Sequence, residues 1–129
     1  MGKAGMRPLD FVSVARQLGK NEDEASLRSA ASRAYYGAFH FAGQRLEELT
    51  ANHSNSFRWS GVRKNHDNLR AEWRLRWGPA GYLIASFLFD AHEMRKTADY
   101  ELEVVFTPED KAAAFGFVAQ ALLAVHRMR

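Results

Sequence analysis

The sequence contains no cysteine and only three prolines among its 129 residues. Without cysteine the chain cannot form a disulfide, a thiolate metal site or a cysteine nucleophile, and a reducing cytoplasm is the expected compartment. A metal would have to be held by histidines and carboxylates. No two histidines lie three or four residues apart, the spacing with which one helix presents two ligands. We therefore expect neither a metal nor another cofactor.

Long apolar runs are also absent. The longest, "GPAGYLIASFLF" (78–89), is shorter than the roughly 20 residues that a membrane-spanning helix needs. The opening "MGKAGMRPLD" lacks the apolar segment of a secretion signal. We expect no membrane association. A composition of 47% hydrophobic and 26% charged residues fits a single globular domain over residues 1–129.

Apolar residues recur at helical spacing along most of the chain. Proline and small polar residues mark the helix ends, with a capping box predicted from Asn21 to Glu24 and an N-cap at Thr107. The expected helices cover 8–18, 22–50, 58–77, 82–98 and 108–128. The segment "DYELEVVF" (99–106) is read as a connector, because no second strand is available to pair with it. The predicted fold is an all-α, up-and-down bundle of about five helices.

The charges are unevenly distributed, although the net charge is only +3. Six basic residues face two acids in the middle of the chain: Arg58, Arg63, Lys64, Arg70, Arg74 and Arg76 against Asp67 and Glu72. Seven acids lie between positions 90 and 110. This separation fits either an anionic partner near the middle of the chain or a self-complementary surface between two copies.

The stretch "SRAYYGAFH" (32–40) places Arg33 and His40 nearly two helical turns apart, so the two side chains point the same way. The opposite side of this helix is apolar, with Leu27, Ala31, Tyr35, Ala38, Ala42, Leu46 and Leu49. The pair is therefore expected outside the core of its own chain. On geometry alone, a solvated polar face is the preferred explanation, because charged helix faces are common. However, Gly37 costs about 1 kcal/mol in mid-helix unless something packs closely there, which favours a two-fold interface along Ser29–Glu47.

The segments "LRSAASRAYYGAFHFAGQRL" (27–46) and "MRKTADYEL" (94–102) resemble the HEPN family of small helical domains. The resemblance implies a helical bundle that dimerises. Active members are metal-independent ribonucleases with an arginine, four to six residues, and a histidine, and Arg33 and His40 match with six between them. It also implies supporting roles for Arg95 and Asp99. Other members have lost catalysis and bind nucleotide, RNA or a protein partner.

The chemistry implied for the pair is simple. A histidine near neutral pKa takes the proton of a ribose 2′-hydroxyl, and a guanidinium holds the phosphate oxygens. One histidine does not easily serve both sides of a phosphate, so a homodimer would supply the second. Tyr36 would position phosphate or a base, or simply pack at a helix interface. By analogy the chain would be the toxin of a toxin–antitoxin pair with a nucleotidyltransferase-type antitoxin.

The other candidates also have plainer explanations. A basic stripe along the third expected helix would either bind RNA phosphates or be exposed to solvent. It consists of Arg63, Arg70 and Arg74. His66 lies at core spacing and is expected to be a buried or interface histidine, whereas His92 is isolated in the sequence. Arg95 and Asp99 are four residues apart, the spacing of an ion pair within one helix.

Overall fold

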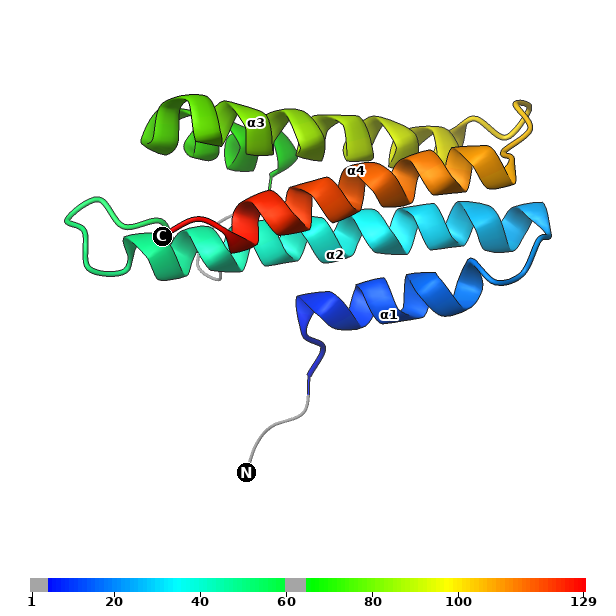
Figure 1. Ribbon diagram of the computed structural model, residues 1–129, viewed down its shortest axis with the longest axis horizontal. Coiled ribbons are helices and arrows are strands. Elements are labelled where there is room, and N and C mark those ends of the chain that lie inside the picture. Colours follow the sequence, from blue (N-terminus) through cyan, green and yellow to red (C-terminus); the bar gives the residue numbers. More distant parts are fainter. Residues whose placement is uncertain (1–4, 60–64) are drawn as a thin grey trace.

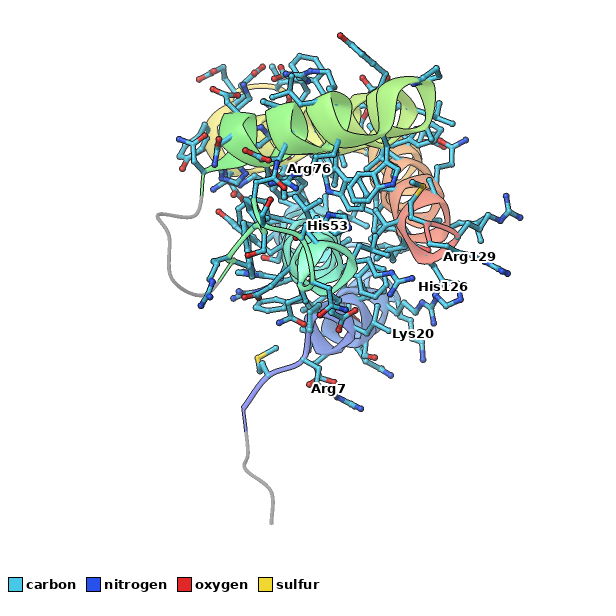
Figure 2. The ribbon with its side chains drawn as sticks, turned by 90° about the vertical axis from the view of Figure 1, so that its left-hand side faces the viewer. Arg7, Lys20, His53, Arg76, His126 and Arg129 are labelled. Atoms are coloured by element: carbon cyan, nitrogen blue, oxygen red, sulfur yellow. The ribbon has the colours of Figure 1, made fainter. Side chains whose placement is uncertain are left out.

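The computed structural model describes residues 5–59 and 65–129, and all regular structure in these ranges is helical. The helices are α1 (Pro8–Leu18), α2 (Glu24–Thr50), α3 (His66–Tyr100) and α4 (Pro108–His126). Helix α2 runs along the middle of the molecule and packs against the other three, with α1 and α3 on opposite sides (Figure 1). Viewed end-on, α4 lies beside α2 (Figure 2). No helix in the described part of the chain is long and apolar enough to span a membrane.

Helix α3 is folded back on itself at Gly78, which joins the third and fourth expected helices. Gly78 has φ 53° and ψ −129°, in the left-handed half of backbone space that glycine enters at little cost, and Pro79 follows it. Arg70 Nη1 lies 3.2 Å from His92 Nδ1, although a straight helix would separate residues 22 apart by about 33 Å. Over residues 5–59 and 65–129 the bundle therefore has four helices with a folded third, where about five separate helices were expected.

Two of the expected helix starts are wrong. Asp23, not Asn21, is the N-cap of α2, and its side chain accepts a hydrogen bond of 3.0 Å from the Ser26 amide. The Glu24 carboxylate is unavailable for a capping box, because it pairs with Arg28 and accepts from a distant backbone amide. Helix α3 begins at residue 66 rather than 58. The expected N-cap Thr107 is confirmed, and so is the connector before it over residues 101–106, whereas Asp99 and Tyr100 are the last two residues of α3.

The apolar side of α2 forms the core, as its spacing predicts. The residues buried there are Leu27, Ala31, Tyr35, Ala38, Ala42 and Leu46. Trp73 is fully buried against the same core, so it offers no free face for stacking a base, and Trp77 packs partly buried beside it. Burial of these large side chains is the main contribution that holds the helices together.

Gly37 lies against α1 of the same chain, which corrects the reason given for a glycine at this position. A Cβ there would approach Val12 Cγ2 to 2.7 Å and the Pro8 carbonyl oxygen to 3.0 Å. The close packing that a mid-helix glycine indicates is thus made within one molecule. A second copy cannot occupy the centre of the Ser29–Glu47 stripe without displacing α1.

Two glycine-to-alanine substitutions in helix interiors are expected to change the free energy of unfolding in opposite directions. Gly37→Ala should destabilise the protein by about 1–3 kcal/mol, because its methyl group meets Val12 and the α1 backbone. Gly116→Ala in α4 should stabilise it by up to about 1 kcal/mol, because a Cβ there meets nothing within 4 Å. Urea unfolding of both variants measures the difference. Stabilisation by both would show that α1 does not pack on Gly37.

Candidate functional site

Arg33 and His40 lie on one side of α2 in different surroundings. Arg33 is exposed and makes no hydrogen bond or ion pair with the described residues. The His40 ring is half-buried, stacked on Phe11 of α1 at 5.6 Å, with the edges of Phe39 and Trp59 at 5.2 and 5.9 Å. The pair is therefore not wholly outside the core, because α1 and the segment before α3 fix the imidazole while the guanidinium stays in solvent.

The imidazole of His40 remains reachable from outside. It lines an open hollow of about 250 Å³ between the start of α1 and the middle of α2. The other lining residues are Met6, Pro8, Phe11 and Gln44. None of them is charged, so the hollow offers His40 and the Gln44 amide as its polar side chains.

The supporting residues expected from the sequence meet on the α3 side of α2. Arg95 and Asp99 form the expected ion pair, with Nε and Oδ2 2.8 Å apart. Asp99 also accepts a hydrogen bond of 3.1 Å from the Ser32 hydroxyl, which ties α3 to α2. The Arg95 guanidinium lies over the Tyr36 ring at 5.1 Å and over the Tyr100 ring at 5.4 Å. Arg95 thus contacts both tyrosine rings, and Tyr36 of α2 packs against a cationic, hydrogen-bonded junction with α3.

Two histidines that sequence spacing did not connect stack on each other beside this junction. His66 and His92 have ring centroids 4.3 Å apart and nearly parallel planes. His66 also stacks on Phe39 at 4.3 Å, and its Nδ1 is 2.5 Å from the Tyr35 hydroxyl. His92 also stacks against the Tyr35 ring at 5.0 Å, and the Tyr35 and His66 rings are 5.5 Å apart. The only signal in the sequence was Tyr35 itself, since a tyrosine on an apolar helix face needs a polar partner.

Burial and neighbouring cations keep these two imidazoles neutral. Desolvation is the largest cause of the lowered pKa of His66, followed by the charges of Arg95 and Arg70, and the charge of His40 acts in the same direction. Desolvation, then His66 and Arg70, lower the pKa of His92 to about 4. Burial raises the pKa of Tyr35, so its hydroxyl stays protonated beside His66 Nδ1. The positive charge around His66 and His92 at neutral pH therefore comes from Arg70 and Arg95.

Folding stability should fall on acidification from pH 7 to pH 5 because of His92. Its pKa is lowered to about 4 in the folded protein, against about 6.5 when unfolded, so in this window the unfolded chain binds more protons. The contribution of neutral His92 to the free energy of unfolding is complete above pH 6.5 and is lost as the pH falls towards 4. Urea midpoints at both pH values should differ less in His92→Phe. His126→Gln, at the outer end of α4 (Figure 2), should keep the wild-type difference.

The predicted basic stripe is divided by the fold. Arg63 lies outside the described residues. Arg70 is buried, paired with Asp67, bonded to His92 and placed over the Phe89 ring at 5.3 Å. Arg74 is half-buried and makes no hydrogen bond or ion pair with the described residues.

No group of three or more histidine, aspartate or glutamate side chains in the described ranges is arranged to hold a metal ion. The arrangement that is present combines a half-buried imidazole, an exposed guanidinium and a second guanidinium fixed by a carboxylate. Comparison of the chain with protein-family models, curated proteins and solved structures gives no match.

Proposed function

We propose that this chain is a metal-independent endoribonuclease of the HEPN type that acts as a homodimer. The observation that carries the proposal is the convergence on Tyr36. The His40 ring lies 6.4 Å from the Tyr36 ring, and the Arg95 guanidinium lies 5.1 Å from it. His40 and Arg95 are 55 positions apart in the sequence, and the HEPN resemblance assigns both to one site. Both lie beside Tyr36, and Arg33 is on the same side of α2.

In the proposed mechanism His40 accepts the proton of a ribose 2′-hydroxyl, whose oxygen then attacks the adjacent phosphorus. Arg33 holds the phosphate oxygens, because its guanidinium is exposed and makes no ion pair with the described residues. Arg95 adds positive charge, and Asp99 fixes its position. The 5′-oxygen leaves after protonation by His40 of the partner subunit, which leaves a 2′,3′-cyclic phosphate.

The physiological setting that we propose is a toxin–antitoxin pair with a nucleotidyltransferase-type antitoxin, by analogy with the HEPN family. Two copies would meet through the exposed part of the Ser29–Glu47 stripe, because α1 covers Gly37 at its centre.

The alternative is a non-catalytic HEPN module that binds nucleotide, RNA or a protein partner. It is favoured by the aromatic packing of His40 between Phe11, Phe39 and Trp59, which also suits a histidine with a purely structural role.

Incubating the purified protein with a mixed-sequence RNA pool in EDTA separates the two functions. We expect fragments that carry 2′,3′-cyclic phosphate ends at a rate that added Mg²⁺ does not raise. Light scattering on the same sample should report a dimer. A protein that binds this pool and leaves it intact would exclude the endoribonuclease and favour the binding module.

A further inference from the structure

The two parts of α3 line an open surface hollow of about 380 Å³. It is separate from the hollow beside His40, and it is within the range of about 300–1,000 Å³ that is usual for small-molecule sites. The residues that line it come from both parts of the folded helix: Arg70, Arg74, Tyr82, Ala85, Ser86 and Phe89.

The hollow carries positive charge with no acid in its lining. Arg70 cannot move easily, since it is 7% exposed and is held by Asp67 and His92. Asp67 offsets part of that charge, although it does not line the hollow. Arg74 makes no hydrogen bond or ion pair with the described residues, so its guanidinium is available for a ligand. An anionic group such as a phosphate complements this lining.

The facing wall is aromatic. Tyr82 and Phe89 are 61% and 47% exposed, and they lie seven residues apart on one side of α3, about 10 Å along its axis. This separation accommodates a planar ring between them at two ring-to-ring distances of about 4.5–7 Å. Ala85 between them is buried and small, which leaves room, and the exposed Ser86 adds a hydroxyl. The wall therefore suits a flat, partly polar ring.

We propose that this hollow binds one nucleoside monophosphate unit, with its base between Tyr82 and Phe89 and its phosphate on Arg74. A base alone would leave Arg74 unpaired, and a phosphate alone would leave in water the Tyr82 ring and the part of the Phe89 ring that Arg70 does not cover. The site goes beyond the proposed endoribonuclease, because it requires no bond to break. A free mononucleotide and a single nucleotide within an RNA strand present the same chemistry to it.

Titration calorimetry with AMP, adenosine, inorganic phosphate and a six-residue oligoadenylate tests the proposal. AMP should bind more tightly than adenosine or phosphate. Tyr82→Ala and Phe89→Ala should each weaken AMP binding about 5–150-fold, and Arg74→Gln about tenfold or more. Leu83→Ala, at an exposed neighbour outside the lining, and Arg127→Gln, at the residue that follows α4, should leave AMP binding unchanged. Circular dichroism confirms that each variant is folded.

The oligonucleotide identifies the source of the ligand. Tighter binding of oligoadenylate than of AMP supports a nucleotide within RNA, and equal or weaker binding supports a free mononucleotide. Absence of saturable binding to both, or equal losses in the lining and control variants, overturns the site. A wild-type protein that cleaves no RNA, but whose AMP binding depends on Tyr82, contradicts the proposed endoribonuclease alone. Cleavage with AMP binding unaffected by all three lining variants contradicts this site alone.

Discussion

His40→Ala is expected to lower the rate of RNA cleavage by about 10²–10⁴-fold, the usual contribution of a general base. RNA affinity should change little, because Arg33 rather than His40 is assigned to hold the phosphate. Arg33→Ala should lower the rate comparably and also weaken binding, because a guanidinium contacts the phosphate both before and during the reaction. Single-turnover rates and filter binding with one RNA substrate measure the two effects.

Because the His40 ring packs on Phe11 and Trp59, a control must separate chemistry from packing. His40→Phe keeps a flat ring in that position and removes the titratable nitrogens, so it should be as inactive as His40→Ala with a near wild-type melting temperature. His126→Ala, an exposed histidine in the last turn of α4, should retain full activity. An active His40→Phe enzyme would show that the ring packs and does not catalyse.

Arg28→Met is expected to destabilise the protein by about 3–5 kcal/mol, lowering the melting temperature by about 10–20 °C. Arg28 is 9% exposed and donates to the carbonyl oxygens of Thr97, Ala98, Glu101 and Val104, at 2.9–3.1 Å for the first three. Methionine fills the space and leaves these oxygens without their donor.

The matched control is Arg7→Met. Arg7 pairs with Asp10 at 3.2 Å, but its side chain is 84% exposed, so its loss should cost less than about 1 kcal/mol. Thermal unfolding of both variants at one pH makes the comparison. Similar melting temperatures would show that Arg28 does not anchor the end of α3 to α2. Arg28→Met should also reduce RNA cleavage, because Arg28 anchors the backbone at Thr97 and Ala98, and the neighbouring Asp99 positions Arg95.

Much of the local structure could be predicted because helical periodicity and capping act over a few residues. Pro8 at the first turn of α1, the Thr107 cap of α4 and the buried side of α2 all follow from neighbouring residues. The ion pair of Arg95 with Asp99 follows from their four-residue spacing. The shared direction of Arg33 and His40 comes from the same geometry, although their function stays a prediction.

The surroundings of the candidate site could not be predicted in this way. Their contacts join segments that only the folded chain brings together. The stacking of His66 on His92 and the burial of Arg70 both depend on the reversal of α3 at Gly78. The sequence marked that glycine as the end of a helix, but not the direction the chain takes afterwards.

By itself, then, the sequence determined an all-helical chain, the buried face of α2 and the residues that face away from it. Tertiary structure decided what covers each of those faces. In the folded chain α1 packs over Gly37 and against His40. Arg28 donates to the backbone that follows α3. The physical reason is range: propensity and periodicity depend on residues within a turn or two, whereas burial, pKa and ion pairing depend on neighbours up to about 80 positions away.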